Sequence, residues 1–457
     1  MAHSLIIQPL KDIPDLLALH ASHPERYPHL LTSNKTTIFG EDNNNIARFD
    51  ILFACPQQTI ASDDSDFLKQ LDQAWLAEKT DELIQTELPF KGGWFLYLGY
   101  ELAQQIETGL YLPPAEDGLP VAFATRMPAA VIIDSHTQQA FLVCESDFAD
   151  CKIQIETDLA QLNLNSKTGY LQTFDISDIH EDDETQYLQH LEKLHQYIID
   201  GDVFQVNLSR CWQARLTSQV NHASLFNQLC QSNPGPFNAL VTLGRKAIIS
   251  SSPERLIQYK DGCLETRPIA GTRPRSTNTE TDNSLSSELL AHPKERAEHI
   301  MLIDLERNDL GRVCEPGSVE VNELMVLESY RHVHHIVSNV RGNPREDVTP
   351  GQLIAATFPG GTITGCPKVR CMEILAELEQ VGRGAYTGSL GYLNHDGSMD
   401  LNILIRTITR DNDKLQFRAG GGIVVDSNPL NELNETRAKA KGMIQALQSG
   451  NKHLQNN

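Results

Sequence analysis

The sequence contains no run of about 18 consecutive apolar residues, which a membrane-spanning helix would need. Its amino terminus, MAHSLIIQPLKDIPD, has neither a basic start nor a sustained apolar core, so we expect no export signal. Positive charge is also scarce, because 38 Lys and Arg face 60 Asp and Glu, for a net charge of −22. We therefore expect neither a membrane nor a nucleic acid as a partner, since both attract basic patches.

Nine cysteines are scattered along the chain, and none of them forms a C-x-x-C pair. An odd number without that spacing argues against a disulfide framework and against a C-x-x-C zinc or redox motif. Reduced thiols fit the cytoplasm, where we expect the protein to reside. With 457 residues, 40% of them hydrophobic, the chain can bury a large core.

The chain divides by composition into three segments. Residues 1–145 mix short apolar runs with Gly and Pro, which indicates strands and helices together. Residues 146–184 are polar and acidic and could connect two regions, and residues 185–450 hold strands that mostly follow strands. This order predicts large antiparallel sheets with helices outside. Helical patterns within the last segment cover 185–200, 285–305, 367–380 and 429–448.

Two pairs of glutamates occur at helical spacing. Glu295 and Glu298 lie three residues apart on one predicted helix. Glu432 and Glu435 have the same spacing on a predicted helix near the carboxyl end, with Lys439 on the same face. Either pair alone is more often a solvated helix face than a ligand set. Both pairs together could converge on Mg²⁺, which prefers a few carboxylates, several waters and a substrate anion.

Other candidates are weaker when taken singly. The Gly-rich turn FPGGTITGCPKVR leads into a helix, and Thr362 and Lys368 could meet an anion there, although such a turn is more often a plain loop. The glycines of RAGGGIVVDS would let a backbone approach a ligand closely, or mark a bulge. Single polar residues interrupt apolar, strand-like stretches, and each alone is more often structural. They are Gln205, Glu254, His335, Tyr386 and Arg406.

Taken in order, the motifs resemble one family. They are QVNLS, SSPERL, PIAGTRPR, KERAEHIMLIDLERNDLGRV, HHIVS, FPGGTITGCPKVR, TGSLGY, IRT, AGGGIVVDS and NETRAKA. This set resembles the chorismate-binding enzymes, which include anthranilate, aminodeoxychorismate, isochorismate and salicylate synthases. The resemblance implies an α/β (α+β) fold of two large packed antiparallel sheets with helices outside. It also implies that 1–145 is built into the same unit as the catalytic segment 185–450.

The resemblance further implies roles for single residues. Mg²⁺ would be held by Glu298 and Glu435, with Glu295 and Glu432 behind them or acting through water. Glu254 would be the general acid, because the ring hydroxyl of chorismate is a poor leaving group that needs a proton. The other implied catalytic positions are Gln205, Ala270, His335 and Thr362, and the implied substrate-binding residues are Tyr386, Arg406, Gly420, Gly421, Gly422 and Lys439.

The nucleophile follows from one position of the resemblance. Isochorismate and salicylate synthases activate water with a lysine where this chain has Gln205, so ammonia is the implied nucleophile. Relatives that use ammonia obtain it from glutamine through a small partner glutaminase. This chain has no G-x-C-x-G nucleophile motif of its own, so we expect such a subunit as a partner.

Two aminated products are possible, one for folate and one for tryptophan. QVNLS, FPGG, AGGGIV and RFDI favour amination at C4, towards p-aminobenzoate, and the Leu-Leu-Glu-Ser element of tryptophan-inhibited anthranilate synthases is not found. Ala270 favours anthranilate instead, because C4-aminating relatives have a lysine there. We expect 4-amino-4-deoxychorismate, with anthranilate as the alternative. A catalytically silent binding or regulatory subunit is the remote one.

Overall fold

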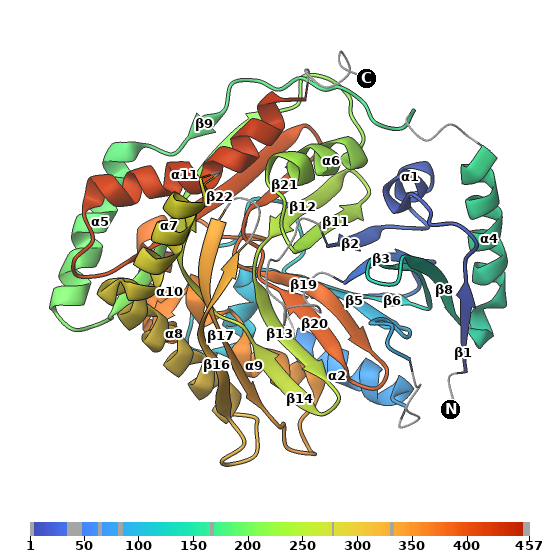
Figure 1. The fold of residues 1–457 in the computed structure, drawn as a ribbon, viewed down its shortest axis with the longest axis horizontal. Helices are drawn as coiled ribbons and strands as arrows, with labels where there is room; N and C mark the ends of the chain where they lie inside the picture. The colour runs from blue at the N-terminus through green and yellow to red at the C-terminus, as the bar shows by residue number, and fades with distance from the viewer. Residues whose placement is uncertain are drawn as a thin grey trace.

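The computed structural model describes residues 4–33, 48–62, 66–80, 86–164, 169–276, 278–329 and 333–450. Two antiparallel sheets pack against each other, and the helices lie outside them (Figure 1). The predicted fold of two large packed sheets is therefore confirmed.

The first sheet has 12 strands among the described residues. In spatial order they are β1 (Leu5–Pro9), β8 (Gln139–Glu145), β7 (Ala129–Asp134), β3 (Phe49–Ala54), β2 (His29–Thr32), β11 (Phe237–Leu243), β12 (Lys246–Ser252), β21 (Thr407–Asp411), β22 (Lys414–Ile423), β10 (Gln205–Arg215) and β18 (Gly365–Cys366), with β9 (His180–Glu181) beside β10.

The second sheet has 10 strands in the same part of the chain. Their order is β15 (Ile269–Pro274), β17 (Val333–Gly342), β14 (Cys263–Thr266), β13 (Arg255–Lys260), β20 (Met399–Asn402), β19 (Ser389–Asn394), β5 (Gly93–Leu98), β6 (Ala122–Met127) and β4 (Thr59–Ser62), with β16 (Glu320–Ser329) beside β17.

Both sheets combine strands from the two ends of the chain. In the first sheet β2 pairs with β11, and in the second β5 pairs with β19. Phe53, Ile132 and Ile248 of the first sheet and Phe95 and Phe123 of the second share one buried cluster. The core between the sheets is thus built jointly, which accounts for the intertwined arrangement. The acidic segment 146–184 contributes α4 (Ala149–Leu164) and β9.

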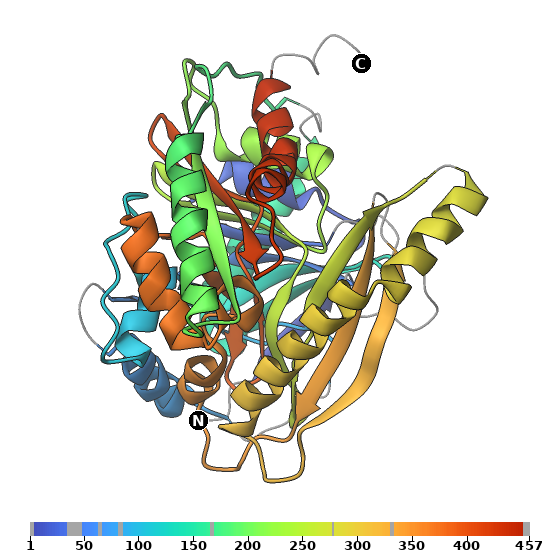
Figure 2. The ribbon, with the colours of Figure 1, turned by 90° about the vertical axis from the view of Figure 1, so that its left-hand side faces the viewer.

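Three helices pack against the first sheet near β10, towards one edge of the sheet. They are α5 (Glu184–Ile199), α10 (Lys368–Glu379) and α11 (Pro429–Gln448), and Figure 2 shows them grouped on that side. Leu191 of α5, Leu375 of α10 and Leu433 of α11 meet Leu208 of β10 in one apolar cluster. The helices predicted at 185–200, 367–380 and 429–448 are confirmed.

The helical pattern expected at 285–305 is confirmed, and it spans parts of two helices. These are α7 (Thr279–Ala291) and α8 (Pro293–Gly311), which meet at His292. Proline disfavours helical angles at the preceding residue, and His292 is extended at ψ 115°. The remaining helices are α1 (Leu16–Ser22), α2 (Phe67–Glu78), α3 (Ala103–Ile106), α6 (His222–Ser232) and α9 (Pro350–Thr357), with short 3₁₀ turns at Tyr100–Leu102, Ser146–Phe148 and Gly361–Ile363.

Two crossings between the sheets lie side by side. The chain leaves the first sheet after β12 and enters the second at β13, so Glu254 lies at the crossing. It leaves the second sheet after β20 and returns to the first at β21, with Arg406 between them at φ +52°. The backbone N–H of Ile403 donates to the carbonyl of Glu254 at 3.0 Å, and that of Ser251 to the carbonyl of Arg406 at 3.2 Å. The single strand expected through Arg406 is therefore wrong.

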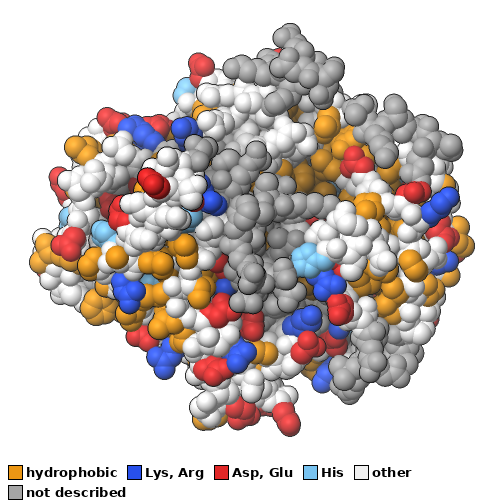
Figure 3. Space-filling model, in the orientation of Figure 1, with side chains coloured by type: hydrophobic (Ala, Val, Ile, Leu, Met, Phe, Trp, Pro, Cys, Tyr) orange, Lys and Arg blue, Asp and Glu red, His pale blue; other side chains and the backbone are white. Residues whose placement is uncertain are grey.

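The surface mixes charges of both signs. On the face in Figure 3, Lys and Arg side chains lie among Asp and Glu side chains over the described surface. In that part of the chain, no helix combines the length and the apolar character needed to cross a membrane. All nine cysteines lie within it, and none of them is in a disulfide.

Candidate active site

Glu254 is a buried carboxyl group at the first crossing, and its side chain is only 6% exposed. The hydroxyl of Thr362 donates a hydrogen bond to Oε1 at 2.8 Å, and the backbone of Ile269 forms another. Burial raises the pKa of Glu254 to about 7, although Thr362, Lys439 and Arg406 each act to lower it. About half of the Glu254 side chains hold a proton at pH 7, as a general acid requires.

His335 is on β17 and, like Glu254, lies within electrostatic reach of Arg406. Its Nδ1 is 3.0 Å from the hydroxyl of Thr272 and 3.3 Å from the carbonyl oxygen of Gly271. Burial lowers the pKa of His335 to about 4, and the positive charge of Arg406 adds to the effect. The imidazole is therefore neutral at pH 7, and Arg406 supplies the positive charge at this end of the site.

Gly420, Gly421 and Gly422 of β22 form a segment, here called the glycine floor, that side chains approach from both faces of the sheet. Gln205 and Asn207 lie on one face, and the glutamates of α11 lie on the other. A Cβ at Gly420 would lie 2.7 Å from Oδ1 of Asn207 and 2.9 Å from the hydroxyl of Tyr386. At Gly421 it would lie 3.2 Å from Glu432 Oε2 and 3.7 Å from Glu435 Oε1, and at Gly422 it would collide with the amide of Gln205. A side chain at Gly420 or Gly422 would displace these groups, whereas one at Gly421 would make only a tight contact with the glutamates.

Lys439 connects this floor to α11. Its Nζ donates to the carbonyl of Gly420 at 2.9 Å and pairs with Glu435 Oε1 at 2.8 Å. Glu432, one turn earlier, is 7% exposed. The second glutamate pair therefore faces the glycine floor, next to a cation that balances part of its charge.

The first glutamate pair lies at the His335 end of the site. Glu295 Oε1 pairs with Arg273 at 3.2 Å, and its Oε2 would be 2.8 Å from a Cβ at Gly271. Within the described residues, no three His, Cys, Asp or Glu side chains are arranged to hold a metal. The candidate donors are carboxylate oxygens, which suit Mg²⁺, and water and a substrate anion would have to complete its coordination.

The remaining predicted residues lie as follows. Gln205 begins β10, and Ala270 is on β15 with 8% of its surface exposed. Tyr386 is in the turn before β19, so its expected place on a strand is wrong. The structure thus brings together Glu254, Thr362, Arg406, His335, Lys439, Tyr386 and the three glycines.

Lys368, which was expected near an anion, is paired with a carboxylate of the chain itself. Its Nζ pairs with Asp309 at 2.6 Å and donates to the carbonyl of Thr357 at 3.3 Å. Glu306, one turn before Asp309 on α8, is 4% exposed, and burial raises its pKa to about 8. The sequence analysis missed this acidic pair, although its i, i+3 spacing on α8 matches that of Glu295 and Glu298.

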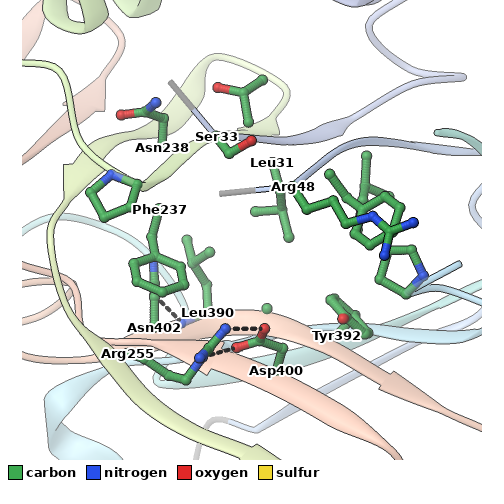
Figure 4. Close-up of a pocket in the computed structure, with 16 residues that line it drawn as sticks. Leu31, Ser33, Arg48, Phe237, Asn238, Arg255, Leu390, Tyr392, Asp400 and Asn402 are labelled. Atoms are coloured by element: carbon green, nitrogen blue, oxygen red, sulfur yellow. Dashed lines mark hydrogen bonds and ion pairs between the residues drawn. The ribbon is translucent and has the colours of Figure 1, made fainter. Parts of the chain in front are cut away.

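A separate cavity lies between the sheets (Figure 4). Arg255, which follows Glu254 in the chain, points into it and forms a two-bond ion pair with Asp400 at 2.9 and 3.0 Å. The other lining residues come mainly from β2, β3, β11, β19 and β20 and include Ser33, Asn238 and Tyr392. None of the residues predicted for catalysis lines this cavity.

Comparison with known proteins gives one family. The family described as chorismate binding enzyme matches residues 33–445. An anthranilate synthase component I-like protein from Synechocystis is 43% identical over 80% of this chain and 74% of its own length. Component 1 of aminodeoxychorismate synthase is 40% identical in Bacillus subtilis, over 79% of this chain and 77% of its own, and 35% identical in Salmonella typhimurium, over 96% and 95%.

A solved structure agrees with this result. Anthranilate synthase component I from Streptococcus pneumoniae superimposes with a TM-score of 0.78 at 31% sequence identity. The match covers 90% of this chain and 95% of the other.

Proposed function

The chain belongs to the chorismate-binding enzymes, and from this premise we propose that it aminates chorismate at C4, as the large subunit of an aminodeoxychorismate synthase. The observation that carries the amination of chorismate, whichever carbon is attacked, is Glu254, a buried carboxyl group with a pKa of about 7 and a fixed hydrogen bond from Thr362. Such a group can protonate a ring hydroxyl that would otherwise not leave.

The proposed reaction involves no net oxidation or reduction, so it needs no redox cofactor. The C4–O bond of chorismate breaks, and the hydroxyl leaves as water with the proton of Glu254. A C–N bond forms at C4 with ammonia, whose nitrogen then loses one proton, to give 4-amino-4-deoxychorismate for p-aminobenzoate and folate. Ala270 offers no amine, so no covalent bond between enzyme and ring is part of this proposal.

The cations of the site bind the substrate. Arg406 and Lys439 both lie within electrostatic reach of Glu254 and can meet the carboxylates of chorismate. Mg²⁺ would be held by Glu298 and Glu435, with Glu295 and Glu432 behind them or acting through water. Bound there, it would supply positive charge for the ring carboxylate of chorismate.

Ammonia is proposed to come from a separate glutaminase subunit in the cytoplasm. Gln205 stands at the pocket end of β10 and has no group that could deprotonate water. Free ammonium at high concentration should replace the partner in the assay.

The alternative is the large subunit of an anthranilate synthase. Ala270 favours it, and relatives with that name are as similar as those named aminodeoxychorismate synthase. Both products require the ring hydroxyl to leave, so Glu254 serves either of them. C4 amination is favoured by the sequence motifs and by the near-complete alignment with the Salmonella enzyme.

The test is chromatography of the products formed from purified protein, chorismate, Mg²⁺ and ammonium. We expect 4-amino-4-deoxychorismate, no product after chelation of the metal, and rescue of a p-aminobenzoate auxotroph. Fluorescent anthranilate as the main product would overturn C4 amination. The absence of any product with the glutaminase supplied would favour the silent subunit.

A further inference from the structure

Two side-chain amides on β10 lie beside the glycine floor, and their oxygens have no hydrogen-bond donor among the described residues. Gln205 and Asn207 are two residues apart on the strand, so both side chains leave the same face of the sheet. Gln205 Oε1 and Asn207 Oδ1 are buried, and no group in the described part of the chain donates a hydrogen bond to either. Leaving a buried carbonyl without a donor is energetically costly, so a ligand that donates hydrogen bonds is expected here.

Asn207 is held firmly in this position. Its backbone N–H donates to the carbonyl of Thr364 at 3.0 Å, and its carbonyl accepts from Arg383 at 2.7 Å. Its side-chain Nδ2 lies 3.5 Å from the carbonyl of Thr362, and its Oδ1 would be 2.7 Å from a Cβ at Gly420. The amide oxygen therefore faces the pocket. Thr362 lies between Asn207 and the general acid Glu254 and contacts both side chains.

Of the reactants in the proposed reaction, only ammonia is left to donate a hydrogen bond to the amide oxygen of Asn207. The carboxylates and the ether oxygen of chorismate only accept hydrogen bonds, and its C4 hydroxyl must lie at Glu254 to receive the proton. Ammonia is small and carries three N–H groups. We propose that Asn207, together with Gln205, holds the ammonia that attacks the ring, which makes Asn207 a specificity-determining residue for the nucleophile; this inference rests on the proposed function.

A neutral amide suits this task better than a carboxylate would. A carboxylate stabilises ammonium by charge, and ammonium has no lone pair with which to attack carbon. An amide carbonyl accepts an N–H bond from ammonia and leaves the lone pair free. The same oxygen also stabilises the positive charge that grows on nitrogen as the C–N bond forms.

The test measures Asn207→Leu and Asn207→Asp with ammonium as the amino donor. Chorismate and ammonium are varied separately, so that each KM is obtained. For Asn207→Leu we expect the KM for ammonium to rise about tenfold, the effect of about 1.4 kcal/mol, while the KM for chorismate stays within about twofold. For Asn207→Asp we expect kcat to fall about tenfold without a rise in the KM for ammonium, because the carboxylate holds the unreactive ion.

Gln213→Leu is the matched control, because Gln213 is on the same strand but exposed, and both KM values should be kept. Thermal unfolding checks that each variant folds, and Asn207→Asp, which keeps the shape of the side chain, maintains the test if Asn207→Leu does not fold. An unchanged KM for ammonium in Asn207→Leu, a rise in the KM for chorismate instead, or an unchanged kcat in Asn207→Asp would overturn the inference.

The two proposals fail in different ways. A wild-type protein that forms no aminated product overturns both. Wild-type formation of anthranilate overturns only the C4 assignment, and the KM comparison still tests Asn207. Wild-type amination with unaltered kinetics in the two Asn207 variants overturns this inference alone.

Discussion

Replacing Glu254 with glutamine tests the general acid directly. The amide keeps the size of the side chain and can still accept the hydrogen bond of Thr362, but it carries no acidic proton. A positioned general acid contributes about 10²–10⁴ in rate, so we expect kcat to fall by about that factor. The KM for chorismate should change little, because Arg406 and Lys439, the cations proposed to bind its carboxylates, remain.

The pH dependence gives a second measure of the same group. Glu254 must hold its proton, and its pKa is about 7, so wild-type kcat should decline as pH rises through 7. The variant should lack this decline. Initial rates with ammonium at a constant concentration of free ammonia, from pH 5.5 to 9, give both profiles.

The raised pKa also affects stability. The folded protein keeps the Glu254 proton that the unfolded chain releases near pH 4.5, so this group costs stability as pH rises from 4.5 to 7. At 1.36 kcal/mol per pKa unit the cost above pH 7 is about 3 kcal/mol. Glu254→Gln should therefore gain about that much over the wild type between pH 4.5 and 8, measured by urea unfolding of the metal-free protein.

The control is Asp72→Asn, because Asp72 is a carboxyl group on α2 whose pKa burial also raises. It accepts hydrogen bonds from Thr349 and Gly351, far along the chain from Glu254, and its loss should leave the pH profile of kcat unchanged. Glu254 is not the general acid if Glu254→Gln keeps more than about a tenth of wild-type kcat, since a general acid contributes a larger factor in rate.

Three further variants test other parts of the site and its support. Thr362→Val removes a donor that lowers the pKa of Glu254, so the decline of kcat should move to higher pH; a profile like that of the wild type would count against the contact. Glu435→Gln should raise the Mg²⁺ concentration for half-maximal rate at least about tenfold in a metal titration, and an unchanged value would refute the ligand assignment. Arg383→Met breaks a fully buried ion pair with Glu379 and should cost about 3 kcal/mol in urea unfolding, with a loss below about 1 kcal/mol as the contrary result.

Local patterns in the sequence were sufficient for much of the fold. Helices α5, α10 and α11 were predicted because apolar residues recur at helical spacing, and strand-to-strand order predicted antiparallel sheets. The two glutamate pairs were visible for the same reason, since i, i+3 spacing puts both side chains on one face. Pro293 likewise predicted the start of α8, because proline suits the first turn of a helix.

Tertiary structure alone decided where the chain crosses between sheets. The same apolar pattern is compatible with one continuous strand or with two successive strands that belong to different sheets. Arg406 therefore looked like a strand residue but lies at a crossing with positive φ, and Tyr386 lies in a turn. Pairing of β20 and β21 with distant strands determines this, and no local pattern records it.

The sequence by itself determined the family, the residue types of the site and their order along the chain. The protonation states came only from the fold. Glu254 meets Thr362, which is 108 residues further along the chain, and its pKa depends on burial between elements that the sequence does not place together. Lys368 pairs with Asp309, and the amide oxygen of Asn207 has no donor among the described residues, for the same reason. Burial and electrostatic energy depend on distances in space, whereas sequence patterns record distances along the chain.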